Sequence, residues 1–107
     1  MTLPPALAPL GAYKQFITHN ADKVPTDWRT GLPCNPHDPE VWTDYLTAYL
    51  AGDGRVGFVL TANDPFWCLD VDHCAVDGAW SALALEIRGM LPSCAFEISQ
   101  SGQGWHL

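Results

Sequence analysis

Residues 66–78, FWCLDVDHCAVDG, begin as a hydrophobic run and become acidic at Asp70. Alternate side chains of a strand project to the same face, so Asp70 and Asp72 point together. Leu69 and Val71 then point to the opposite face, into the core. Two neighbouring carboxylates repel each other, and Mg²⁺ or Mn²⁺ relieves that repulsion because these ions prefer oxygen ligands. The pattern predicts a strand that ends in a metal-binding pair.

Two other interpretations of this segment remain open. In the first, the two acids are simply solvated at the end of a strand. In the second, Cys68, His73 and Cys74 bind zinc. A calcium loop is excluded by its spacing, because the sixth position holds Ala75 in place of Gly and the twelfth holds Ser81 in place of Glu.

A second motif, SQSGQGWH, follows about one helix later in the chain. Its glycines allow positive φ and close approach of the backbone to a ligand, and successive amides in such a turn form an anion-binding concavity. Its hydroxyl groups and its imidazole suit a phosphate oxygen. An ordinary hairpin turn remains the alternative. The residues that we select as candidates for nucleotide binding are Ser99, Ser101, Gly102, Gly104 and His106.

The two motifs are more informative together than apart. One helix separates them, so the strand with the acidic pair and the strand with Glu97 can be neighbours in one sheet. A metal-binding pair and a phosphate-binding turn would then face the same space. Nucleotidyl transfer requires this pairing, because cations stabilise the charge on the attacking oxygen and on the leaving pyrophosphate.

Composition limits the classes of protein that the chain fits. With 107 residues it has the size of one domain, and its net charge of −7 argues against a broad basic surface for nucleic acid. The four cysteines form no C-x-x-C pair, which favours reduced thiols. The N-terminus has no basic region typical of a secretory signal, and no run approaches the roughly 18 apolar residues of a membrane span. We expect a cytoplasmic protein without membrane contact.

Hydrophobic periodicity predicts an α+β domain. It has a mixed β-sheet, two helices on one face and an open ligand-binding face. We expect Asp38 to cap the first helix, Gly52 to end it, and Asp77 to cap the second. A long irregular connection covers residues 21–39. The predicted strands are 12–20, 55–61, 65–71, 95–99 and 105–107, and the predicted helices are 38–54 and 77–91.

These motifs resemble the catalytic domain of bifunctional DNA primase-polymerases, in the phage and plasmid branch of the archaeo-eukaryotic primase superfamily. That family has a hydrophobic strand that ends in D-x-D, followed by E-x-S-x-S-G-x-G-x-H. Weaker similarity lies upstream, at Lys23–Pro25, Asp38–Trp42 and Gly57–Thr61. The resemblance covers residues 13–107, and residues 1–12 are expected to form a flexible lead-in.

The resemblance implies roles for the residues of both motifs. Asp70 and Asp72 would bind Mg²⁺ or Mn²⁺, and His106 would contact the triphosphate of the incoming nucleotide. Ser99, Ser101, Gly102 and Gly104 would shape the nucleotide pocket. The catalytic residues are then Asp70, Asp72 and His106.

The family also has a third acidic motif, which would lie beyond residue 107. We therefore expect the N-terminal part of a primase-polymerase domain, inactive or weakly active alone, with a helicase domain downstream. Nucleoside triphosphates and a weakly bound single-stranded DNA template are the expected partners, in the host cytoplasm if a phage encodes the protein. The alternatives are a non-catalytic nucleotide-binding or interaction module of a replication protein, and an unrelated metal-dependent phosphohydrolase.

Overall fold

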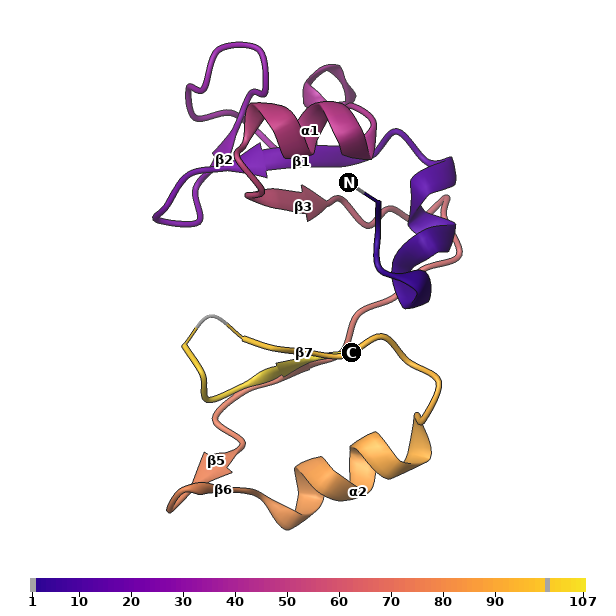
Figure 1. Cartoon of the computed structure of the whole chain (residues 1–107), viewed down its shortest axis with the longest axis vertical. Helices are drawn as coiled ribbons and strands as arrows, with labels where there is room; N and C mark the ends of the chain where they lie inside the picture. Colours follow the sequence, from indigo (N-terminus) through magenta and orange to yellow (C-terminus); the bar gives the residue numbers. More distant parts are fainter. Residues whose placement is uncertain (1, 100) are drawn as a thin grey trace. The chain divides into compact units, whose positions relative to one another are not determined.

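The chain combines helices with short antiparallel strands, which confirms the predicted α+β class (Figure 1). The computed structural model describes residues 2–99 and 101–107. The chain forms two compact units, Met1–Pro65 and Phe66–Leu107, where its size predicts one domain. The reason lies in the core, because each unit contains a hydrophobic cluster of its own.

The first unit contains a three-stranded antiparallel sheet in the order β2-β1-β3. The strand predicted over residues 12–20 forms as β1, and the one predicted over residues 55–61 forms as the shorter β3. Helix α1 packs against both of these strands (Figure 1). The elements of this unit are η1 (Pro5–Ala12), β1 (Phe16–His19), β2 (Pro25–Thr26), η2 (Pro39–Val41), α1 (Tyr45–Ala51) and β3 (Val56–Phe58).

The lead-in predicted over residues 1–12 contains a 3₁₀ helix, η1. Pro5 is the first helical residue and Pro9 lies inside the helix. Proline fixes φ near −65°, which a 3₁₀ helix accommodates. The prolines of this segment are therefore compatible with local helical structure.

The single helix predicted over residues 38–54 is wrong at its start. Asp38 caps only the short helix η2, accepting a hydrogen bond from the N–H of Glu40. Thr43 then forms a bridge with Phe16, with N···O distances of 3.0 and 2.8 Å. This pairing requires extended backbone and interrupts the helix, which begins again as α1. Gly52 ends α1, as predicted.

Asp44 is the N-cap of α1, and Asp44→Ala is expected to lower the free energy of unfolding of the first unit by about 1 kcal/mol. Its carboxylate accepts hydrogen bonds from the backbone N–H of Thr47 at 2.9 Å and from the Thr47 hydroxyl at 2.8 Å. The backbone bond is the main reason why the pKa of Asp44 lies below its ordinary value of 3.8. Urea unfolding, followed at the amides of α1, measures the change.

The lowered pKa of Asp44 also sets the sign of the pH dependence. The carboxylate contributes its full stabilisation above the unfolded pKa and loses it as the pH falls through the lower folded pKa. Wild type should therefore lose its advantage over Asp44→Ala in acid. Asp44→Asn retains an acceptor and gains no proton, so its advantage should persist. A wild-type advantage that stayed constant in acid would contradict this assignment.

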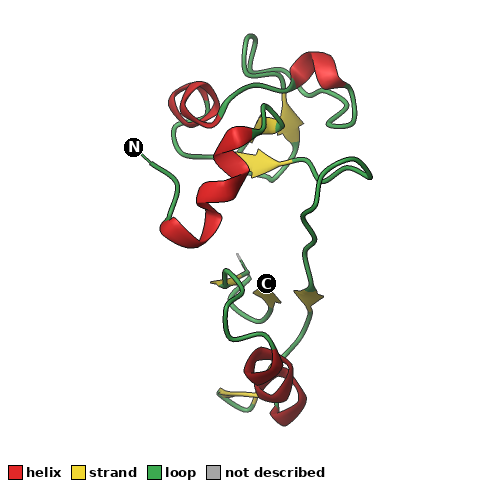
Figure 2. Ribbon diagram, turned by 90° about the vertical axis from the view of Figure 1, so that its right-hand side faces the viewer, coloured by secondary structure: helices red, strands yellow, loops and turns green. Residues whose placement is uncertain are grey.

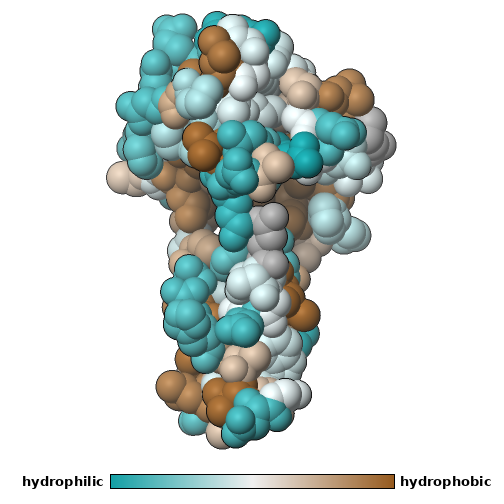
Figure 3. Space-filling view, turned by 90° about the vertical axis from the view of Figure 1, so that its left-hand side faces the viewer, coloured by the Kyte–Doolittle hydropathy of each residue, from teal (hydrophilic) through white to brown (hydrophobic). Residues whose placement is uncertain are grey.

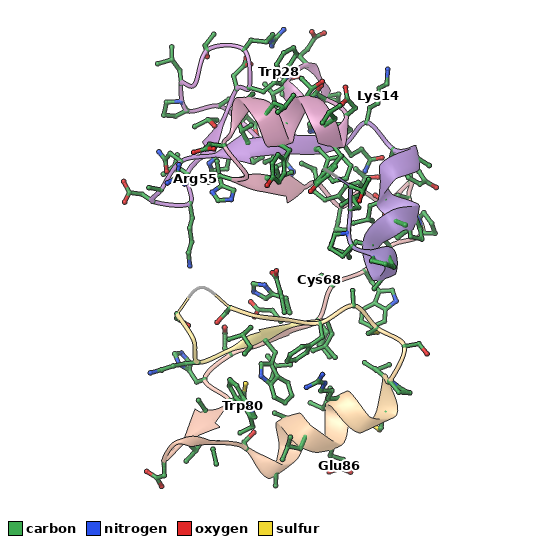
Figure 4. The ribbon with its side chains drawn as sticks, in the orientation of Figure 1. Lys14, Trp28, Arg55, Cys68, Trp80 and Glu86 are labelled. Carbon is green, nitrogen blue, oxygen red and sulfur yellow. The ribbon has the colours of Figure 1, made fainter. Side chains whose placement is uncertain are left out.

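The second unit contains a three-stranded antiparallel sheet in the order β4-β8-β7 and a separate hairpin of β5 and β6. Trp105 on the central strand is fully buried. Side chains fill the space between the sheet and α2, and Trp80 is among them (Figure 4). The elements are β4 (Asp70–Val71), β5 (Ala75–Val76), β6 (Ala79–Trp80), α2 (Ala82–Met90), β7 (Glu97–Ile98) and β8 (Trp105–His106).

The helix predicted over residues 77–91 also starts later than expected. Asp77 and Gly78 have φ values of 51° and 79° and form the turn between β5 and β6. Asp-Gly favours such a hairpin because both residues accept positive φ. Ser81 caps α2 in place of Asp77, with its hydroxyl oxygen 3.2 Å from the N–H of Ala84.

The predicted single mixed sheet is replaced by three small antiparallel sheets. Among the described residues, α1 packs against β1 and β3 of the first unit, whereas α2 belongs to the second unit. Figure 2 shows how short the strands are beside the loops that join them. Parallel pairing requires a long crossover, whereas β7 and β8 are joined by a tight turn, which produces an antiparallel pair.

The surface carries both hydrophobic and hydrophilic side chains. On the face drawn in Figure 3, hydrophobic residues lie among hydrophilic ones. On α2 the hydrophobic side chains of Leu83 and Met90 are exposed. Within residues 2–99 and 101–107, no helix has the length and apolar character needed to cross a membrane.

Candidate functional site

The candidate site lies on one face of the β4-β8-β7 sheet in the second unit. Leu69 fixes the register of β4, because its N–H and C=O both bond to Leu107, at 2.9 and 3.0 Å. Leu69 and Val71 pack against the hydrophobic cluster of this unit, as predicted. Asp70 is exposed and lies directly opposite His106 on β8. The apolar residues of β4 therefore hold the strand, and its carboxylate faces outward.

His106 lies between two carboxylates. Its Nε2 is 3.7 Å from Oδ1 of Asp70, and its Nδ1 is 2.6 Å from Oε1 of Glu97. Glu97 is the cross-strand partner of His106 on β7, just as Asp70 is on β4. The strand with Glu97 is therefore not a direct neighbour of the strand with Asp70, because β8 lies between them.

Asp72 follows β4 directly and lies beside the glycine turn. A Cβ atom added to Gly104 would be 3.6 Å from Cα of Asp72 and 3.0 Å from the carbonyl oxygen of Val71. The absence of a side chain at Gly104 therefore allows β4 and the turn to approach each other. Asp72 is exposed and belongs to the turn that follows β4, so strand alternation does not define the face on which its side chain lies.

The turn that joins β7 to β8 is held together by its own serines. The hydroxyl oxygen of Ser99 is 3.0 Å from the N–H of Gly104 and 3.0 Å from the hydroxyl of Ser101. Ser101 accepts a bond of 3.3 Å from the N–H of Gln103. Gly102 has a φ of 78°, which a glycine adopts without strain.

This bonding changes the predicted role of the turn amides. The N–H groups of Gly102, Gln103 and Gly104 all donate within the turn. In this conformation they do not form the anion-binding concavity that the glycine pattern predicts. A phosphate group at this site would therefore depend first on His106 and on the serine hydroxyls.

The sequence predicts that Glu97 faces the site and could support it, but it does not predict the contact of Glu97 with His106. Strand alternation places Glu97 on the same face as Ser99, which was the available signal. No local pattern shows which residue stands opposite it on the next strand. The hydrogen bond of 2.6 Å follows from the β7–β8 register.

The site face is acidic. Burial raises the pKa of the Cys68 thiol, and the negative charges of Asp70 and Glu97 raise it further. A thiol that retains its proton is a poor ligand for zinc. Cys74 is buried in the core, so Cys68, His73 and Cys74 do not form the alternative zinc site. Over the part of the chain that the structure describes, no group of three or more His, Cys, Asp and Glu side chains could hold a metal ion.

Asp70 and Asp72 nevertheless offer carboxylate oxygens, which are the kind of ligand that Mg²⁺ and Mn²⁺ bind. Both ions accept one or two carboxylates and complete their coordination with water and substrate phosphates. Asp70 is 58% exposed, so water and a ligand can reach its carboxylate. These two residues are the ones that would hold the ion.

A pocket lies in the first unit. This pocket of about 290 Å³ is lined in part by Trp28, Arg29 and Arg55 (Figure 4). Asp27 accepts two bonds from the Arg29 guanidinium, at 3.0 and 2.9 Å. Hydrogen bonding from Arg29 lowers the pKa of Asp27 and keeps it ionised. Arg29 is thus already paired, which limits its use as a phosphate contact.

Comparison with known proteins gives one relevant relative. No protein-family model matches the sequence. The chain is 32% identical, over an alignment of 116 residues, to the DNA primase-polymerase of Nitratiruptor phage NrS-1. The chain is similar to a DNA primase-polymerase. The match covers 96% of this chain and 16% of the relative, so it corresponds to a small part of that protein.

Proposed function

We propose that this chain is the metal- and nucleotide-binding part of a DNA primase-polymerase, a nucleotidyltransferase of phage or mobile-element replication. The observation that carries the proposal is the cross-strand placement of Asp70 opposite His106, with their side chains 3.7 Å apart. The two motifs that suggest nucleotidyl transfer thus meet on one face of one sheet. The similarity to the phage protein supports the same conclusion independently of this geometry.

In this proposal each residue has a defined task. Asp70 and Asp72 would hold Mg²⁺ or Mn²⁺, and the ion would supply the positive charge that neutralises the triphosphate and the leaving pyrophosphate. His106 orients the triphosphate by contacting a phosphate oxygen. Ser99 and Gly104 shape the turn that brings β8 beside β4.

We expect the 107 residues alone to synthesise primers weakly or not at all. Two carboxylates are too few for the oxygen ligands of a two-metal site, and the described residues offer no larger cluster. The net charge of −7 also disfavours tight binding of a single-stranded DNA template. A helicase domain in the parent protein remains part of the proposal.

Binding of a nucleotide in the presence of a metal ion tests the proposal directly. The ¹⁵N-labelled chain is titrated with dATP, with Mg²⁺ and with both together. We expect the largest shifts at Asp70, Asp72 and His106, and only when both ligands are present. Shifts confined to the pocket around Trp28, or no shifts at millimolar nucleotide, would overturn the proposal.

A non-catalytic nucleotide-binding module is the second candidate, favoured by the small number of acidic ligands. It predicts the same nucleotide binding and no contribution to synthesis. Template-dependent primer synthesis by a protein that contains this segment decides between the two functions. Loss of that synthesis in Asp70→Asn would exclude the module.

A further inference from the structure

We infer that Glu97 is a positioning residue that fixes the orientation of the His106 imidazole, an inference that rests on the proposed function. The Nδ1 of His106 lies 2.6 Å from Oε1 of Glu97. The two residues are directly opposite each other in the β7–β8 pair, so the backbone register holds the contact in place. This contact is the shortest that the imidazole makes, since Asp70 is 3.7 Å away.

The contact determines which ring nitrogen is available to a ligand. An ionised carboxylate accepts hydrogen bonds and cannot donate, so Nδ1 of His106 is the donor to Glu97. The other nitrogen, Nε2, is turned toward Asp70, at a separation longer than a hydrogen bond. Nε2 is therefore the ring nitrogen left for a phosphate oxygen, to which it donates when the imidazole carries a proton on both nitrogens, beside the carboxylate that would hold the metal ion.

Glu97 contributes little to the stability of the unit. Its side chain is 70% exposed, and exposed ion pairs contribute little to stability. The core of the unit is built instead around Trp105, on the opposite face of the sheet. Replacing Glu97 should therefore change the position of the imidazole and leave the fold intact.

Three variants separate the hydrogen bond from the charge. Glu97→Ala removes both, whereas Glu97→Gln retains an acceptor oxygen for Nδ1–H. Glu86→Gln removes the same charge from α2, elsewhere in this unit (Figure 4), and is the matched control. Each variant is examined by ¹⁵N NMR of the His106 ring and by titration with Mg²⁺ and dATP.

We expect the wild-type ring to carry its proton on Nδ1 when it is neutral. In Glu97→Ala that preference should disappear. The Kd for dATP should rise about three- to tenfold, because the imidazole is no longer oriented by a charge-assisted hydrogen bond. Glu97→Gln should show a smaller rise in Kd, and Glu86→Gln should match wild type. Unfolding by urea should be unchanged in all three variants.

The two readouts distinguish failure of this inference from failure of the proposed function. If wild type does not bind dATP, the proposed function fails, while the ring nitrogens still report whether Glu97 holds the imidazole. If wild type binds dATP and His106→Ala weakens binding, the function stands. In that case an unchanged ring tautomer and an unchanged Kd in Glu97→Ala would overturn the inference.

Discussion

Trp105→Ala is expected to lower the free energy of unfolding of the second unit by about 3–5 kcal/mol, the usual cost of truncating a buried Trp. Trp105 is 0% exposed and is the largest fully buried side chain in the described chain. Its ring centroid lies 5.1 Å from that of Trp80 and 5.2 Å from that of Phe96. Small domains have about 5–15 kcal/mol of stability, so this loss removes a large share of it, and the second unit should unfold at a much lower urea concentration than in wild type.

Two substitutions act as controls for Trp105→Ala. Trp67, in the same unit, is 55% exposed, so Trp67→Ala should change stability by less than about 1 kcal/mol. The Nε1 of Trp105 is buried, with no hydrogen-bond partner among the described residues. Trp105→Phe removes this unsatisfied donor and should therefore cost much less than Trp105→Ala.

Resolved amide signals from each unit, followed by NMR during urea unfolding, measure these changes separately. The first unit serves as the internal reference, because Val41, Val59 and Ile17 form its own cluster. Trp105→Ala with unchanged urea resistance in the second unit would show that the cluster around Trp105 does not hold this unit together.

Local sequence patterns predicted the class of fold and many of its elements, because they act over short distances. The alternation around Asp70 correctly placed Leu69 and Val71 against the core. Hydrophobic periodicity correctly placed helical turns in α1 and α2, with Gly52 as the end of the first. Each of these features depends on residues that lie only a few positions apart in the sequence.

The predicted bounds of the helices are wrong where a residue distant in the sequence, or a competing local signal, determines the backbone conformation. Pairing of Thr43 with Phe16 interrupts the first helix, and nothing near Thr43 in the sequence indicates that partner. The second helix was extended across Asp77 and Gly78, although Asp-Gly is a strong hairpin signal. There, the helical spacing of the apolar residues that follow competes with the turn signal.

The same distinction explains how much of the site could be predicted. The D-x-D spacing and the glycine turn select the acidic residues and His106 as candidates, and the structure places Asp70 opposite His106, while their roles stay predictions. The position of β8 between β4 and β7 could not be read from it, because strand pairing depends on register across the sheet. The hydrogen bond of Glu97 to His106 depends on that register and was therefore missed.

Asp70→Asn and Asp72→Asn are each expected to weaken metal-dependent dATP binding by about tenfold or more, and the double variant to abolish it. An amide oxygen carries no net charge, so it holds Mg²⁺ far less well than a carboxylate does. Binding of dATP without the metal ion should change little. Isothermal titration with and without Mg²⁺ measures both quantities.

The control for charge is Asp77→Asn, which removes one carboxylate from the turn between β5 and β6. Asn tolerates positive φ, so the hairpin should persist and dATP binding should match wild type. Asp70 and Asp72 are exposed, so the double variant should unfold at the urea concentration that unfolds wild type. A double variant that retained full metal-dependent binding would show that the acidic pair is only a solvated strand end, because both proposed ligands would then be dispensable.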